Sequence, residues 1–244
     1  MEKSLNDPAF ENIAENLKVI RERVSKAALA SGRNENEVKL MAVTKTIEPL
    51  RINYAISQGV DLIGENRVQE FQSKIDELDM TNCKAHLIGH LQSNKAKKIV
   101  GEVDVIQSVD TVSIAKEIAK HAVNRGITQK VLLEVNIGCE WSKFGFDISE
   151  IPEKVYEMAE INGIKVKGLM CVAPICDDNG KLFGIFENMH KLFIDICNKK
   201  IDNIDMDILS MGMSGDYETA ILAGANLVRV GSAIFGPRIY SDKH

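Results

Sequence analysis

The chain has 244 residues, of which 45% are hydrophobic and 27% are charged, and its formal net charge is −5. This length suffices for one large core and is typical of a single α/β barrel, so we expect one domain over residues 1–244. The acidic balance argues against broad binding to nucleic acid or to anionic membranes, both of which need a basic face. No stretch approaches the roughly 20 apolar residues of a membrane span, and the first ten residues lack the apolar segment of a signal peptide, which predicts a cytoplasmic protein.

Apolar residues that recur every three or four positions predict an opening amphipathic helix over residues 9–31. Short apolar strands then alternate with amphipathic helices. We predict strands over residues 38–45, 61–65, 85–89, 105–108, 130–136, 166–172, 207–211 and 227–231. We predict helices over residues 49–58, 68–77, 95–100, 112–125, 151–161, 182–199 and 217–223. Eight strands with seven intervening helices match a (β/α)8 TIM barrel with an extra N-terminal helix. An open doubly wound sheet is the alternative, but it usually has fewer strands and favours a glycine-rich first turn that is missing here.

The cysteine and histidine patterns bear on metal and disulfide sites. The five cysteines are spread through the chain without a C-x-x-C pair, at positions 83, 139, 171, 176 and 197. An odd number of cysteines so placed argues against a disulfide framework or a zinc site and predicts mostly reduced core or strand residues.

His86 and His90 are four residues apart, which would suit a metal on a helix. Because they lie in an apolar, glycine-containing segment that we interpret as a strand, we predict no metal site.

Lys45 stands at the end of the first predicted strand. An ammonium group at the end of an apolar barrel strand lies in or just above a packed interior, where desolvation lowers its pKa and favours the neutral, nucleophilic amine. This is the position expected of a lysine that forms a Schiff base. A strand-end lysine that reaches out to solvent is the alternative.

Polar residues also stand at the ends of the second, third and fifth predicted strands, in the segments 64–67, 86–95 and 134–136. Polar side chains that converge on one rim of a barrel are typical of a small-molecule site. Each group alone has a simpler interpretation as a cap or turn residue. Ser93 or Asn94, for example, could cap the helix that follows.

The last two predicted strands lead into segments rich in glycine and serine, over residues 209–216 and 227–232. Backbone N–H groups and hydroxyls at two such neighbouring strand ends suit a phosphate, and barrels often bind phosphate with the loops after strands seven and eight. A Schiff-base lysine and a phosphate site together imply a phosphorylated carbonyl compound. Pyridoxal 5′-phosphate and a phosphosugar both qualify.

Arg229 alternates with two valines on the eighth predicted strand, so its side chain faces the side opposite to theirs. A buried guanidinium needs an acceptor. One interpretation is a salt bridge to a carboxylate such as Glu134 or Asp207. The other is a contact to a ring nitrogen or an oxyanion of a cofactor or ligand.

Six ordered motifs resemble the pyridoxal phosphate homeostasis protein family. They span residues 42–46, 63–70, 86–95, 168–174, 209–216 and 228–236. Proteins of this family look like the N-terminal barrel of alanine racemase standing alone, and the resemblance runs from about Asn12 to Arg238. One departure is Arg67, which stands where the family often has tyrosine.

The resemblance implies that Lys45 carries pyridoxal 5′-phosphate as a Schiff base. It also implies that Ser214, Gly231 and Ser232 hold the phosphate group.

Four further residues are implied to surround the ring. Arg229 faces the pyridine nitrogen and Asn66 lies near the polar edge, while His90 and Met213 line the ring. Because a guanidinium is always protonated, Arg229 can donate to the ring nitrogen but cannot accept a proton from it. The ring nitrogen is then expected to stay unprotonated, which makes the cofactor a poor electron sink and disfavours transaminase and decarboxylase chemistry.

We therefore expect a carrier that helps to control the free concentration of pyridoxal phosphate, with no catalytic residues. An amino-acid racemase is the alternative, but it needs acid–base groups on both faces of the bound substrate, and Lys45 supplies one. In alanine racemases the opposite base is a tyrosine from a second domain, which we expect this chain to lack; Tyr217 alone lies near a strand end. A Schiff-base aldolase acting on a phosphosugar lacks an evident acidic relay. We expect a monomer whose partners are the cofactor and, transiently, apo-enzymes that use it.

Overall fold

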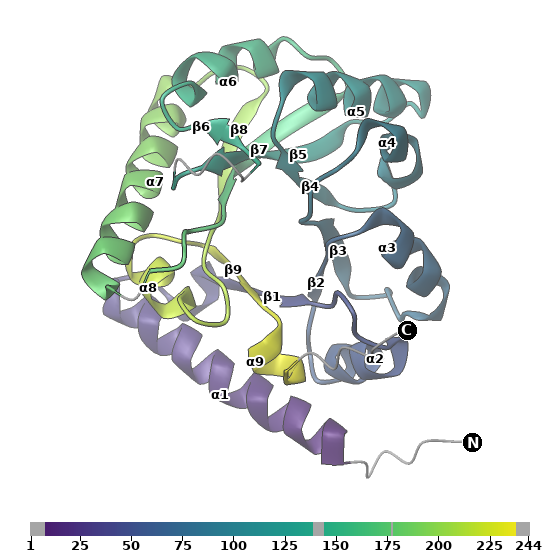
Figure 1. Ribbon diagram of the computed structural model, residues 1–244, viewed down its shortest axis with the longest axis vertical. Coiled ribbons are helices and arrows are strands. Elements are labelled where there is room, and N and C mark those ends of the chain that lie inside the picture. The colour runs from purple at the N-terminus through teal and green to yellow at the C-terminus, as the bar shows by residue number, and fades with distance from the viewer. Residues whose placement is uncertain (1–7, 139–143, 177, 238–244) are drawn as a thin grey trace.

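The chain folds into a closed barrel of eight parallel strands surrounded by helices (Figure 1). The structure is a computed structural model and describes residues 8–138, 144–176 and 178–237. The barrel strands are β1 (Lys39–Val43), β2 (Leu62–Glu65), β3 (Lys84–Leu87), β4 (Val105–Val109), β5 (Gln129–Asn136), β7 (Ile164–Cys171), β8 (Ile204–Ser210) and β9 (Leu227–Val230). Each pairs in parallel with its neighbours, and the pairing of β1 with β9 joins the two ends of the sequence. The predicted (β/α)8 barrel is therefore confirmed.

Helices cover the outside of the barrel. They are α1 (Pro8–Ala30), α2 (Pro49–Ser57), α3 (Val68–Lys74), α4 (Ser93–Ile99), α5 (Val112–Asn124), α6 (Ile151–Ala159), α7 (Asn179–Lys199), α8 (Tyr217–Leu222) and α9 (Ser232–Phe235), with the 3-10 turns η1 (Glu35–Glu37) and η2 (Ile75–Glu77). The predicted helices and strands begin and end within three residues of the observed ones. Three short elements were not predicted: the 3-10 turn η1, the helix α9 and the strand β6 (Phe146–Asp147). Two to four residues are too few to show a periodicity.

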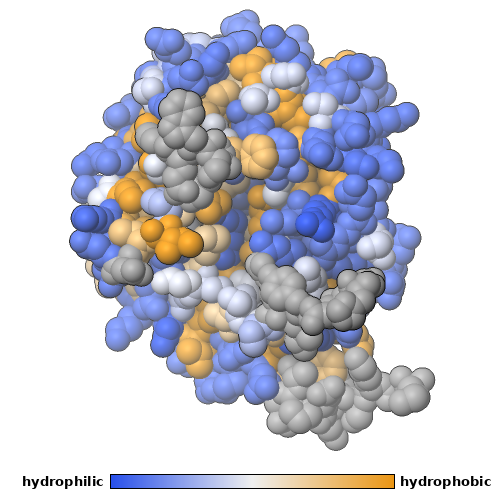
Figure 2. All heavy atoms as spheres, in the orientation of Figure 1, coloured by the Kyte–Doolittle hydropathy of each residue, from blue (hydrophilic) through white to orange (hydrophobic). Residues whose placement is uncertain are grey.

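The hydrophobic core has two parts. The larger part lies between the strands and the surrounding helices. Inside the barrel are two smaller apolar clusters, made of Met41, Leu62 and Leu227 and of Val105, Leu132 and Met170, with Ile208 packed against both. In the space-filling view hydrophilic side chains cover most of the periphery, whereas hydrophobic ones gather toward the centre of the ring (Figure 2).

The opening helix α1 packs along α8 and α9 (Figure 1). Its apolar stripe of Ile13, Leu17 and Ile20 is buried. Just beyond its end, the Arg33 guanidinium donates to the carbonyl oxygen atoms of Ile221 (2.5 Å) and Ala225 (2.8 Å), which satisfies acceptors left over at the end of α8. The helix thus braces the segment that leads into β9.

The described cysteines are free thiols: Cys83 and Cys171 are buried, Cys176 is half-buried and Cys197 is exposed. Cys139 lies outside the described residues. Within the described ranges, no helix has the length and apolar character needed to cross a membrane.

Gly168 lies where the strands β7 and β8 of the barrel wall approach each other closely, so its substitution tests this packing. It lies in β7 where the register with β8 shifts, its φ is +141°, and a Cβ atom there would lie 1.9 Å from the carbonyl oxygen of Ile208. Gly126 also has a positive φ, of +67°, but a Cβ atom there would meet nothing within 4 Å. We expect Gly168→Ala to lower the free energy of unfolding by about 3 kcal/mol or more and Gly126→Ala by about 1 kcal/mol, measured by urea denaturation. Equal losses would contradict this packing.

Candidate functional site

The residues predicted to form a site lie at the carboxyl ends of five barrel strands. Arg229 is in β9 itself, and the others are in the segments that follow β1, β2, β3, β8 and β9, at positions 45, 66, 90, 213, 214, 231 and 232. In (β/α)8 barrels this is the face that carries active sites.

Lys45 lies in a turn, because β1 ends at Val43, two residues earlier than predicted. The amide of Thr44 still donates to the carbonyl oxygen of Gly64 on β2 (3.0 Å), but the amide of Ile47 turns back to the carbonyl oxygen of Thr44 (3.0 Å). The β-branched, apolar composition of this segment gave no sign of the turn. Lys45 is therefore a half-buried residue of the turn that follows β1 and does not belong to the strand itself.

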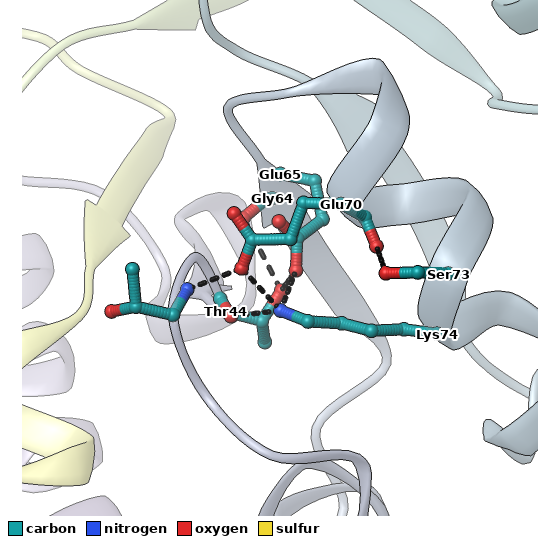
Figure 3. Close-up of polar contacts among 7 residues, drawn as sticks. Thr44, Gly64, Glu65, Glu70, Ser73 and Lys74 are labelled. Atoms are coloured by element: carbon teal, nitrogen blue, oxygen red, sulfur yellow. Dashed lines mark hydrogen bonds and ion pairs between the residues drawn. The ribbon is translucent and has the colours of Figure 1, made fainter. Parts of the chain in front are cut away.

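Side chains of α3 hold the turn that carries Lys45 (Figure 3). The Lys74 ammonium donates to the carbonyl oxygen of Thr44 (3.0 Å), and the backbone amide of Thr46 donates to Oε1 of Glu70 (2.5 Å). The residues on either side of Lys45 are therefore both bonded to a helix of the next βα unit. Sequence reasoning missed this arrangement, because Lys74 and Glu70 look like ordinary helix-surface residues.

Ser214 is hydrogen-bonded to the loop that follows β9. The Ser214 hydroxyl oxygen accepts hydrogen bonds from the backbone amides of Gly231 (3.2 Å) and Ala233 (3.4 Å). Ser232 and Met213 are exposed beside them. A hydroxyl held in place by two backbone N–H groups can direct its own proton to a phosphate group.

Arg229 is buried, with 4% of its surface exposed. Its guanidinium donates to the Ser210 hydroxyl (2.7 Å) and to the carbonyl oxygen of Cys171 (2.7 Å). Burial lowers its pKa, yet a guanidinium stays protonated. Among the described residues we find no carboxylate bonded to Arg229, and Asp207 pairs with Lys167 instead, so a salt bridge to Asp207 is wrong.

A chain of hydrogen bonds continues from Arg229 through the barrel interior. The Ser210 hydroxyl donates to Oε1 of Gln107 (2.7 Å), whose amide nitrogen lies 2.8 Å from Nδ1 of His86. Since β8 and β4 are not neighbours in the sheet, this contact crosses the inside of the barrel. Burial, and then the positive charges of nearby lysines, lower the pKa of His86 to about 3, so the ring is neutral and its Nδ1 accepts from Gln107.

Asn66 and His90 line a hollow of about 490 Å³ at the rim. The side-chain oxygen of Asn66 is buried and finds no hydrogen-bond partner among the described residues. His90 Nδ1 lies 2.7 Å from a carboxylate oxygen of Asp110, and its ring stacks on that of Phe144 with the centroids 3.8 Å apart. Asn94 does not cap α4: the capping position is Gln92, which makes no side-chain cap, so that alternative is wrong.

Glu134 on β5 is a half-buried carboxyl group whose pKa is raised. Burial, and next the negative charge of Asp110, raise its pKa to about 7, against the opposing charge of Arg229. It therefore changes its charge near neutral pH, unlike an exposed glutamate.

The chain matches known proteins over nearly its whole length. The family described as "Alanine racemase, N-terminal domain" matches residues 10–239. A protein of Aquifex aeolicus named "Pyridoxal phosphate homeostasis protein" is 38% identical over 229 residues, which cover 94% of this chain and 100% of that protein. A protein of the same name from Escherichia coli is 36% identical over 235 residues, covering 95% and 99% of the two chains.

Solved structures show the same barrel. PipY of Synechococcus elongatus, solved with PLP bound, superposes with a TM-score of 0.80 at 30% identity and covers 92% of this chain and 100% of its own. The alanine racemase of Clostridium difficile in complex with cycloserine superposes with a TM-score of 0.73 at 15% identity, covering 95% of this chain and 61% of its own, which shows a shared fold alone.

Glu134 predicts a pH dependence of stability. Its folded-state pKa of about 7 lies above the roughly 4.3 of an unfolded glutamate, so between these values the folded chain holds a proton that the unfolded chain has lost. As pH rises from about 5 to about 7, the free energy of unfolding should fall relative to that of Glu134→Gln, by on the order of 3 kcal/mol. Urea denaturation of both proteins at pH 5 and pH 8 measures the difference. A difference that does not change with pH would contradict a raised pKa for this half-buried carboxyl group.

Proposed function

The chain belongs to the pyridoxal phosphate homeostasis proteins, a family built on the alanine racemase N-terminal domain, and we propose that it binds pyridoxal 5′-phosphate reversibly on Lys45 to help control its free concentration. The names of the relatives and the PLP-bound PipY structure support this cofactor. The observation that carries the proposal is the pairing of β1 with β9, with Ala42 opposite Val230. This register sets the turn that holds Lys45 beside the loop of Gly231.

The groups at the barrel mouth fit pyridoxal phosphate. Ser214 supplies a hydroxyl donor for the phosphate. The Asn66 oxygen, which has no hydrogen-bond partner among the described residues, supplies an acceptor for a polar group of the ring. When bound, the cofactor supplies an aldehyde for a Schiff base with Lys45 and a conjugated ring that can withdraw electrons. We assign the phosphate to Ser214, Gly231 and Ser232.

Arg229 sets the electronic character of the site. Its two hydrogen bonds, to Ser210 and Cys171, fix the guanidinium in the barrel interior, and its remaining N–H groups can only donate. Toward a pyridine nitrogen such a cation disfavours protonation, because it would place two positive charges together. Arg229 thus favours holding the cofactor over reactions that need a strong electron sink. We assign Asn66, His90 and Met213 to the ring's surroundings.

The described tyrosines support a carrier over a racemase. Tyr217 is buried in the core at the start of α8, with 4% of its surface exposed. Tyr54 packs against Phe10, and Tyr156 lies by Lys199 on the outer helices. Tyr240 lies outside the described residues. A racemase needs a second acid–base group opposite Lys45, and none of the three described tyrosines is placed to supply it.

We further propose that the protein acts in the cytoplasm as a monomer that exchanges the cofactor with apo-enzymes. Its free cysteines suit a reducing compartment. Its net charge of −5 disfavours anionic partners such as nucleic acid.

Loading of the protein with pyridoxal phosphate tests the proposal. The wild type should develop the absorbance band of a Schiff base, and Lys45→Ala should lose it because the amine that forms the bond is removed. Lys97→Ala, which changes an exposed lysine of α4, is the matched control and should keep the band. A wild-type protein that stays colourless would contradict the proposed function.

The same loaded protein separates a carrier from a racemase. Incubated with common L-amino acids in heavy water, a carrier should exchange the α-proton no faster than free pyridoxal phosphate does. Exchange that depends on the protein and on Lys45 would favour the racemase.

A further inference from the structure

We propose that Lys74 is a positioning residue of this site: together with Glu65 and Glu70 it clamps the backbone on both sides of Lys45 and so fixes the direction of its amine. The inference rests on the proposed function of Lys45. It concerns three charged side chains that make no contact with the phosphate site.

The Lys74 ammonium lies among three hydrogen-bond acceptors (Figure 3). Lys74 is the last residue of α3, and 8% of its surface is exposed. Its Nζ atom lies 3.0 Å from the carbonyl oxygen of Thr44, 3.1 Å from Oε1 of Glu65 and 2.6 Å from Oε1 of Glu70. An ammonium has three protons, so these three acceptors satisfy it completely.

Both neighbours of Lys45 are tied to this cluster. On the N-terminal side, the Thr44 hydroxyl donates to Oε1 of Glu65 (2.7 Å). On the C-terminal side, the Thr46 amide donates to the Glu70 oxygen that also contacts Lys74. Thr46 has a φ of +64°, a left-handed conformation that a β-branched residue rarely adopts, so the bond to Glu70 holds a strained backbone.

The charges of the cluster argue for a role other than stability. One ammonium faces two carboxylates, and the Glu65 side chain is 1% exposed. Its second oxygen has no hydrogen-bond partner within the described part of the chain. Burial raises the pKa of Glu65, against the hydrogen bond from Thr44 and the charge of Lys74. Buried ion pairs seldom stabilise a fold more than apolar residues of the same size would, because the charges must leave water. What this cluster provides is a fixed geometry for the segment that carries Lys45.

A positioning role predicts a selective effect. The cluster of Lys74, Glu65 and Glu70, here called the clamp, holds the turn after β1 from the side of β2 and α3. The Ser214 and Gly231 groups instead follow β8 and β9 (Figure 1). Weakening the clamp should therefore impair bond formation by Lys45 and leave phosphate binding intact. Pyridoxine 5′-phosphate has an alcohol in place of the aldehyde and cannot form a Schiff base, so its affinity reports the phosphate and ring contacts alone.

The test compares the affinities of the two ligands in matched variants. Lys74→Met should weaken pyridoxal phosphate binding about tenfold or more and slow its trapping by borohydride, with pyridoxine phosphate affinity unchanged within about twofold. Lys74→Arg keeps the charge and should recover part of the loss. Lys97→Met, at an exposed position of α4, should change neither affinity.

A second variant covers the case in which Lys74→Met, with two uncompensated carboxylates, does not fold. Glu70→Ala releases Thr46 but leaves Lys74 and Glu65 as a neutral pair. It should show the same selective loss, with an unchanged circular dichroism spectrum. If folded Lys74→Met or Glu70→Ala keeps the wild-type ratio of the two affinities, the clamp is overturned. If the wild type itself binds pyridoxal phosphate no better than pyridoxine phosphate, the proposed function fails, and the inference with it.

Discussion

Closure of the barrel is the constraint on which the rest of the structure depends. The register of β1 against β9, with Met41 opposite Arg229 and Ala42 opposite Val230, joins the first strand to the last. It brings the turn that holds Lys45 next to the loop that offers the Gly231 amide. In an open sheet these two strands would stand apart, and the amine of Lys45 and the loop of Gly231 could not share one ligand.

The barrel interior combines apolar packing with a line of polar groups. Below the mouth, one chain of hydrogen bonds links β9 to β3 through the side chains of Arg229, Ser210, Gln107 and His86. Each buried donor or acceptor in it has a partner, as a polar core must if it is not to cost stability. A guanidinium held in this way by neutral groups keeps its charge and its place, which is what a role beside a cofactor ring requires.

The sequence predicted the fold well because its signals are local and repeated. Alternating strand and helix patterns located all eight barrel strands, and glycine and serine at the last two strand ends indicated the Ser214 and Gly231 contact. The turn at Lys45 and the cluster around Lys74 were missed. Both depend on contacts between segments distant in sequence, and a lysine in a helix has the same local pattern whether it faces solvent or a buried carboxylate.

Borohydride reduction of the protein loaded with pyridoxal phosphate, followed by mass spectrometry of its peptides, tests the central claim most directly. If barrel closure brings one amine to the phosphate-binding loop, the reduced cofactor should be found on Lys45 at one equivalent per chain. Label spread over exposed lysines such as Lys39, Lys84 and Lys130, with none enriched at Lys45, would contradict the account.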